Sequence, residues 1–270
     1  MALAKKLVQF SVIVLLAVLA LWAFVRIPNV VAAPGPPQTI RLDGSSNPFM
    51  PVDVAVNAET GMAYVVNQGV GHVWVISGTE HIGTIDPPGG GCPGPTPYGA
   101  CLNSINVNPF TGKAYVSQWY YDRLNIISGT QLIGWVYGGQ GAAGSVPHPQ
   151  ADTIYALFKW GSGGVTIIKN DDDKIRVYGS DPDAGCVNPL NGYAYIANTK
   201  SNNVLVFDDL VQIATIPVGS MPNGAVCAQH GHVYIVNSGS NPATVSIITG
   251  TQVITTVSVG RSTTLSLIHI

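Results

Sequence analysis

Residues 57–67 read Asn57-Ala-Glu-Thr-Gly-Met-Ala-Tyr64-Val-Val-Asn67, a polar turn followed by a short apolar run around a tyrosine. The same arrangement returns four more times at intervals of about 40 residues, and such a period indicates a repeat architecture. The later segments align on Tyr115, Tyr155, Tyr195 and Tyr234. The first interval is longer because an insertion, residues 86–101, separates the first two repeats.

Each repeat contains four short β-like runs, which in the fourth repeat are residues 184–187, 193–197, 204–207 and 213–218. The first turn reads Asn-Pro-x-Asn/Thr-Gly in two repeats, where Pro pre-sets φ and Gly accepts φ > 0. Four strands per 40-residue repeat are typical of a β-propeller blade, whereas a β-sandwich would not repeat its turns at a fixed period. The sequence therefore predicts an all-β propeller of four-stranded blades. The five expected blades span residues 51–87, 102–138, 143–179, 184–219 and 224–260.

The repeat also carries a family resemblance. The stretch Pro51 to Asn67, with Val-Ala-Val-Asn before the turn and Ala-Tyr-Val-Val-Asn after it, resembles the YVTN family of β-propellers. Tyr195-Ile-Ala-Asn198 and Tyr234-Ile-Val-Asn237 repeat the signature, and Tyr155-Ala-Leu-Phe158 departs from it. The resemblance covers residues 51–260. It implies an exported or surface-layer protein of the kind that acts mostly as an interaction module.

Composition excludes several other classes of protein. The chain of 270 residues has a formal net charge of −2 and only 10% charged residues, so it lacks the basic surface of a nucleic-acid binder. With 46% apolar residues it is not a charge-driven disordered chain. Its 31 Gly and 19 Pro indicate a turn-rich protein rather than a helical bundle.

The N-terminus predicts export. Lys5 and Lys6 precede an apolar run over residues 7–24, and Val31-Ala-Ala33 offers small residues before Pro34. This order is that of a secretory signal peptide in residues 1–33. The run is long enough that an uncleaved membrane anchor stays an alternative. Either form places the propeller outside the cytoplasmic membrane, as a secreted, periplasmic or cell-surface protein.

Both flanks of the repeats suggest a missing part. Residues 265–270 resemble a translated sequencing adapter, which would leave residues 51–264 as the genuine repeat region. Residues 34–50 form a linker with a strand-like Thr39-Ile-Arg-Leu42 that resembles a fourth strand and could close the ring. We therefore expect a propeller truncated from six or more blades, with a five-blade ring as the alternative.

Recognition residues are expected where strands two and three are joined and where blades are connected, because these segments are irregular and rich in aromatics. Exposed aromatics beside Arg and Asp supply large contact area at low entropic cost. Packing against the insertion is the alternative role for Trp119 and Tyr120. The candidate residues are Tyr98, Trp119, Tyr120, Tyr121, Asp122, Arg123, Phe158, Lys159 and Trp160.

The four cysteines fall into two pairs. Cys92 and Cys101 end a Pro/Gly-rich loop in an exported chain, which favours a disulfide between them over a zinc site. Cys186 and Cys227 occupy matching places on the expected innermost strands of consecutive blades. Free buried thiols are favoured for this second pair, with a bridge as the alternative, because the strand separation could exceed the disulfide limit.

Three other motifs carry little functional weight. Gly139-Gln-Gly-Ala-Ala-Gly144 leads into no helix, so it does not indicate dinucleotide binding. Asp171-Asp-Asp173 reads as a polar turn rather than a calcium site, and His230 with His232 lacks a third metal ligand. No catalytic residues, metal or cofactor are therefore predicted.

Together these features predict an exported, non-catalytic binding module whose partner is a protein, a peptide or a cell-wall glycan, with no nucleic acid and no membrane contact beyond an anchor. An enzyme with a central-channel site, such as a lyase, lactonase or quinoprotein-like oxidoreductase, is the first alternative. A structural surface-layer tile is the second. Binding is favoured because Asp53 is the single acidic residue placed in an expected first strand.

Overall fold

The computed structural model describes residue 40 and residues 50–89, 102–161, 163–171 and 173–260, except for the side chains of residues 173 and 174. The chain divides into two units, Met1–Arg41 and Leu42–Ile270, and the strands described below belong to the second. Several predictions concern residues outside the described ranges. They are the signal segment, the Cys92–Cys101 pair, Tyr98, residues 265–270 and the strand-like Thr39 to Leu42, of which only Ile40 is described.

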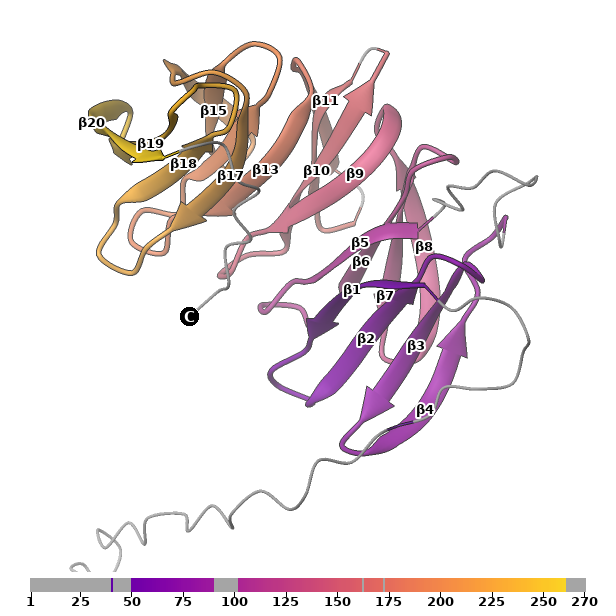
Figure 1. Cartoon of the computed structure of the whole chain (residues 1–270). Helices are drawn as coiled ribbons and strands as arrows, with labels where there is room; N and C mark the ends of the chain where they lie inside the picture. The colour runs from indigo at the N-terminus through magenta and orange to yellow at the C-terminus, as the bar shows by residue number, and fades with distance from the viewer. Residues whose placement is uncertain (1–39, 41–49, 90–101, 162, 172, 261–270) are drawn as a thin grey trace, which may run out of the picture. The chain divides into compact units, whose positions relative to one another are not determined.

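Five antiparallel four-stranded sheets follow one another along the chain, each with its strands hydrogen-bonded in sequence order (Figure 1). The first sheet contains β1 (Pro51–Val56), β2 (Met62–Asn67), β3 (His72–Ser77) and β4 (Glu80–Ile85). The second contains β5 (Leu102–Val107), β6 (Ala114–Gln118), β7 (Arg123–Ser128) and β8 (Gln131–Tyr137). The third contains β9 (Gln140–Pro147), β10 (Thr153–Trp160), β11 (Gly164–Lys169) and β12 (Asp173–Tyr178).

The fourth sheet contains β13 (Pro182–Val187), β14 (Ala194–Asn198), β15 (Asn203–Asp208) and β16 (Val211–Pro217). The fifth contains β17 (Pro222–Cys227), β18 (Val233–Asn237), β19 (Ala243–Thr249) and β20 (Gln252–Gly260). The first strands of consecutive sheets contact one another, β1 with β5, β5 with β9, β9 with β13, and β13 with β17. The prediction of an all-β propeller built from four-stranded blades is confirmed.

Apolar cores fill the spaces between neighbouring blades. The first core joins Tyr64 and Val73 of blade one to Leu102 and Val116 of blade two, and three further cores join the later pairs of blades in the same way. The second, third and fourth sheets therefore bury both of their faces, which explains why β6 and β14 are buried along their whole length. Burial of apolar area at about 25 cal/mol per Å² makes these cores the main stabilising term.

The asparagine that begins the repeat turn in blades one, two and four bonds both its own blade and the next one. Asn108 Oδ1 accepts the backbone N–H groups of Phe110 and Thr111, which is an Asx turn. Its Nδ2 donates to the carbonyl of Ala151 in the following blade at 2.9 Å. Asn57 and Asn188 make equivalent bonds to Gly112 and Gly231. The repeated Asn is therefore a connector between blades, which accounts for its presence in three of the five repeat turns.

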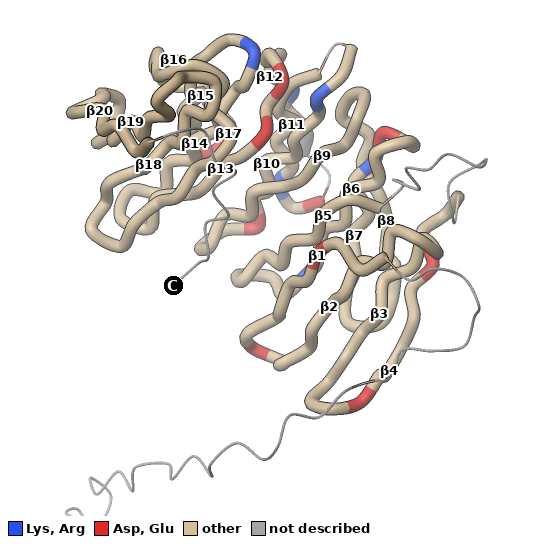
Figure 2. The backbone as a smooth tube through the Cα atoms, viewed as in Figure 1, with Lys and Arg blue, Asp and Glu red and all other residues tan. Residues whose placement is uncertain are grey.

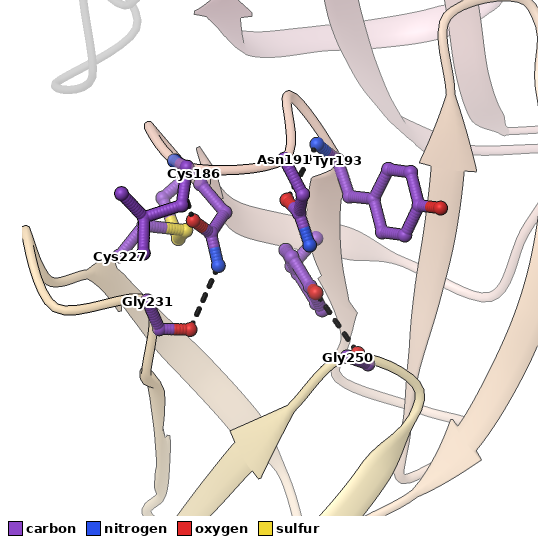
Figure 3. The surroundings of a disulfide bond; sticks show 9 residues. Cys186, Asn191, Tyr193, Cys227, Gly231 and Gly250 are labelled. Carbon is purple, nitrogen blue, oxygen red and sulfur yellow. Dashed lines mark hydrogen bonds between the residues drawn. A yellow bond between two sulfur atoms is a disulfide. The ribbon is translucent and has the colours of Figure 1, made fainter.

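The repeat tyrosine has a similar role. Tyr155 Oη donates to the carbonyl of Asp209, and Tyr195 Oη donates to that of Gly250, each in the turn between strands three and four of the next blade. Tyr195 and Tyr155 are fully buried, so a hydroxyl without an acceptor would be costly there. The signature tyrosine thus combines core volume with one hydrogen bond to its neighbour. Figure 3 shows the Gly231 and Gly250 carbonyls as acceptors.

The expectation of free thiols at Cys186 and Cys227 is wrong. These residues form a disulfide between β13 and β17, the first strands of blades four and five (Figure 3). Their Cα atoms are 5.6 Å apart, which lies within the range that a disulfide spans without backbone movement. The inner strands approach one another more closely than the sequence reasoning assumed.

Within the residues that the structure describes, no helix has the length and apolar character that a membrane span requires. Charged residues are few, and residues 222–260 contain no Asp, Glu, Lys or Arg (Figure 2).

Candidate functional site

The two ends of the blades differ in character. Because antiparallel strands alternate in direction, the loops between strands two and three lie at the same end as the connections between blades. We call this the connection end; it includes loop residues 119–122 and connections 138–139, 179–181 and 218–221. The opposite end, which holds the Asx turns, is called the turn end.

Every first strand carries a β-bulge near the connection end. The pairing with the second strand skips one residue at the same position in all five blades. These residues are Val52, Asn103, Ala143, Asp183 and Asn223. Bulges re-aim side chains and are enriched beside functional sites. Asn103 Nδ2 donates to the carbonyl of Ala143 at 2.8 Å and so joins two consecutive bulges.

Lys159 pairs with Asp183 of the next blade at one of these bulges. The structure therefore places Lys159 in an ion pair between blades rather than among the aromatic candidates. Asp183 lies within β13, so the expectation that Asp53 is the single acidic residue in a first strand is wrong. The sequence reasoning began that strand at residue 184, but pairing extends to Pro182 across the bulge.

The loop after β6 brings four predicted residues together. Trp119 packs edge-on against Trp160 of blade three, with ring centres 4.7 Å apart. Tyr120 packs in the same manner against Tyr121, at 5.4 Å. Asp122 fixes the loop, because its Oδ1 accepts the N–H of Gly141 in blade three at 2.7 Å. The exposed fractions of Tyr120 and Trp160 are 62% and 57%, so large aromatic area remains open to solvent.

Tyr121, rather than Trp119 or Tyr120, contacts the start of the insertion. Tyr121 Oη donates to the carbonyl of Gly89, and its ring lies so close to Gly89 that a Cβ there would clash at 2.6 Å. Tyr121 therefore packs against the start of the insertion. Tyr120 and Trp160 remain exposed instead.

Phe158 is not a surface residue. It lies in β10 with an exposed fraction of 0% and belongs to the core between blades two and three. Its position matches that of Gln118 and Asn198, which are also buried at the ends of second strands. The third repeat departs from the tetrapeptide there because an aromatic side chain fills the volume that an amide occupies in its neighbours.

Arg123 is the most unusual residue of the set. Its exposed fraction is 8%, and three aromatic rings surround its guanidinium carbon. The ring centres of Tyr121, Trp135 and Tyr137 lie 4.9, 5.6 and 5.7 Å from that carbon. Such cation–π contacts stabilise a partly desolvated guanidinium.

Trp135 and Tyr137 were missed by the sequence reasoning because they lie on a strand rather than in a loop. They face Asn125 and Arg123 directly across the β7–β8 pairing. The sequence held one signal, the alternation of Trp135, Val136 and Tyr137 in a strand-like run. In the structure Val136 is buried, and Trp135 and Tyr137 are exposed. We define the aromatic patch as Trp119, Tyr120, Tyr121, Arg123, Trp135, Tyr137 and Trp160.

Ion pairs at the turn end connect blades. Lys113 contacts Asp152 and Asp171 of the next blade, and Lys169 contacts Asp209. Burial opposes the charged form of Lys113, but the hydrogen bonds and charges of the two carboxylates outweigh it and raise its pKa. Asp171 thus belongs to an inter-blade ion pair as well as to a turn.

Buried tyrosines at the turn end have displaced pKa values. Burial, reinforced by nearby aspartates, raises the pKa of Tyr115 and of Tyr155 far above the ordinary value. Burial also raises the pKa of Tyr64 and Tyr195. These shifts belong to residues that hold blades together. His230 and His232 lie ring against ring at the same end, and the described residues contain no group of three or more metal-ligating side chains.

No family model and no curated protein matches the chain. Among solved structures it is similar to virginiamycin B lyase from Staphylococcus aureus, with a TM-score of 0.61 and 10% identity over 76% of this chain and 69% of that one. It is similar to a chain of the nidogen/laminin complex, with a TM-score of 0.53 and 12% identity over 74% and 75%. Kuenenia stuttgartiensis hydrazine synthase gives a TM-score of 0.52 at 15% identity over 60% of this chain.

The chain spans half of the hydrazine synthase chain. At such identities the likeness concerns the fold alone, and it agrees with the five sheets. The protein is a β-propeller.

Proposed function

We propose that the protein is a non-catalytic binding module outside the cytoplasmic membrane, which holds a protein or peptide partner on the aromatic patch. The observation that carries this proposal is the exposure of Tyr120, Tyr137 and Trp160 at 62%, 59% and 57%, each in a ring or cation–π contact with another residue of the patch. Exposed aromatics grouped in this way are typical of interface hot spots.

The rest of the patch supports a preorganised surface. Asp122 ties the loop to Gly141 of the next blade, and Tyr121 ties it to Gly89 of the preceding connection. The loop is therefore hydrogen-bonded to both flanking segments, so it would lose little conformational entropy when a partner binds. Rigid aromatic anchors on a fixed scaffold are what a recognition surface requires.

Two further features agree with the proposed location and family. The Cys186–Cys227 disulfide is compatible with an oxidising, extracytoplasmic compartment. The contacts of the repeated Asn and Tyr give a physical reason for the YVTN-like pattern. A nidogen/laminin chain and a lyase both share the fold, so the site rather than the fold must argue the function.

An enzyme remains the second candidate, and one contact favours it. Lys159 and Asp183 place a charged pair beside the inner-strand bulges, where the first strands of two blades meet. Lys159→Met would abolish such an activity while leaving partner binding to the aromatic patch intact.

A phage-displayed library of random peptides tests the proposed function. Peptides selected on the whole protein should lose at least about tenfold in affinity when Tyr120 and Trp160 are both replaced by Ala. Phe110→Ala is the matched control, because Phe110 is 61% exposed at the turn end. Failure to select any peptide, or equal losses in the control, would overturn the proposal.

A further inference from the structure

We propose that Arg123 is the anion-binding point of the aromatic patch and takes a carboxylate from an acidic peptide segment of the partner. The inference rests on the proposed function, because it names the chemistry of the ligand at that same patch. It is carried by the burial of Arg123, by the absence of a counter-ion among the described residues and by the residues around it.

The guanidinium of Arg123 lacks an acceptor within the described residues. Its Nε is buried without a hydrogen-bond partner. The two terminal nitrogens make no hydrogen bond or ion pair with the described residues either. Unlike Nε, they are not buried, so they reach solvent. A guanidinium offers five N–H donors in a planar fork that matches a carboxylate.

Such an arrangement is costly without a partner. A charge that is removed from water loses solvation, and it regains that energy only through pairing. The rings of Tyr121, Trp135 and Tyr137 compensate in part. They cannot accept the in-plane N–H donors as an oxygen does, so a carboxylate arriving at the terminal nitrogens would complete the site.

Side-chain oxygens close to Arg123 in the sequence or across the sheet make no hydrogen bond with it. Asp122, the next residue along the chain, uses Oδ1 for the N–H of Gly141. Gln118 Oε1 accepts from Asn125 Nδ2. Asn125 Oδ1 is buried without a donor, yet it forms no hydrogen bond with Arg123. No described residue therefore supplies the acceptor, and the proposal assigns it to a carboxylate of the partner.

The surroundings favour a peptide over a glycan. Sugar recognition needs several polar side chains for the hydroxyl groups, but Gln118 and Asn125 are fully buried and unable to reach a ligand. The exposed neighbours of Arg123 are the aromatic Trp135 and Tyr137. An acidic side chain flanked by apolar residues matches this combination of one cation and large aromatic area.

The test uses two phage-displayed pools of seven-residue peptides, random except for a central Glu in one pool and a central Gln in the other. We expect the Glu pool to be enriched at least about tenfold over the Gln pool on the full chain. Arg123→Met should abolish this preference. Lys200→Met, which removes the same charge from an exposed site at the connection end, should leave it unchanged.

Equal enrichment of both pools, still lost when Tyr120 and Trp160 are replaced, would overturn the carboxylate inference and leave the proposed function standing. No enrichment of either pool would overturn both. Binding of a uronic-acid oligosaccharide in place of the Glu pool would overturn the peptide assignment.

Should Arg123→Met fail to fold, the wild-type protein provides a second test. Binding of a selected Glu peptide should fall as pH drops through the carboxylate pKa near 4.3, while its Gln counterpart stays unaffected. Equal pH dependence of the two peptides would contradict the inference.

Discussion

Asn188 Nδ2 donates to the carbonyl of Gly231 at 2.8 Å, so the turn between the first two strands of blade four is bonded to the matching turn of blade five. The same side chain accepts the N–H of Leu190 through Oδ1 and is 1% exposed. One amide therefore closes its own turn and joins two blades. This relationship recurs at Asn57 and Asn108, and it converts a sequence repeat into a structural one.

Asn188→Ala should lower the free energy of unfolding by about 1–3 kcal/mol, because it leaves the buried groups around it without hydrogen-bond partners. Asn191→Ala is the control, since Asn191 is exposed and its Oδ1 accepts the N–H of Tyr193 within its own turn. Urea unfolding measures both variants. Equal losses would show that the inter-blade bond contributes nothing.

His148 takes the place of the repeat Asn in blade three and should make stability depend on pH. Its Nδ1 accepts the N–H of Gln150, and Nε2 donates to the carbonyl of Gly192. Burial lowers its pKa from the ordinary value of about 6.5. The unfolded chain thus binds the proton more readily, so this stability is present above pH 6.5 and is lost as pH falls through the native pKa.

The substitution His148→Asn should keep both hydrogen bonds and remove that pH dependence. Thermal unfolding measured between pH 7.5 and pH 5 would show a smaller decrease in midpoint for the variant than for the wild type. An unchanged decrease would mean that His148 does not contribute to acid sensitivity.

Alkaline pH should destabilise the turn end. The raised pKa of Tyr115 and Tyr155 means that the native protein holds protons that the unfolded chain releases above about pH 10. Their contribution is complete below that pH and is lost as pH rises. Replacing both tyrosines with Phe should raise the alkaline unfolding midpoint, as followed by phenolate absorbance and circular dichroism. A lower or unchanged midpoint would contradict this.

The disulfide should stabilise the last two blades. Cys186 and Cys227 are separated by 41 residues, and closing such a loop contributes about 3–4 kcal/mol in the chain-entropy model. Replacing both by Ala should lower the free energy of unfolding by an amount of that order. Peptide mapping under non-reducing conditions should show the two residues in one linked fragment. Free thiols at both positions would refute the bond.

The fold could be predicted from the sequence because its signals are local and repeated. A tyrosine in the second strand recurs in all five repeats and an Asx turn in three of them, and each repeat needs its neighbour to bury a face. The site was harder to predict. Trp135 and Tyr137 join Arg123 only through the β7–β8 register, which no local pattern reveals.

Other differences have equally specific causes. Phe158 was predicted to be a recognition residue because it stands beside Lys159 and Trp160 in the sequence, yet its side chain fills a core position. Predicting the Cys186–Cys227 disulfide would have required the distance between the inner strands, which depends on how tightly the blades pack. Sequence reasoning identified the irregular end of the blades but could not assign each side chain to core, inter-blade contact or surface.

The most direct test of the central claim is hydrogen exchange of the intact protein with and without a peptide selected on it. We predict that the peptide slows exchange in residues 119–123 and 135–137 and around Trp160, and leaves the Asx turns at residues 108–112 and 188–192 unchanged. Protection confined to the turn end or to the strands around Asp183 would contradict the assignment of the aromatic patch as the binding surface.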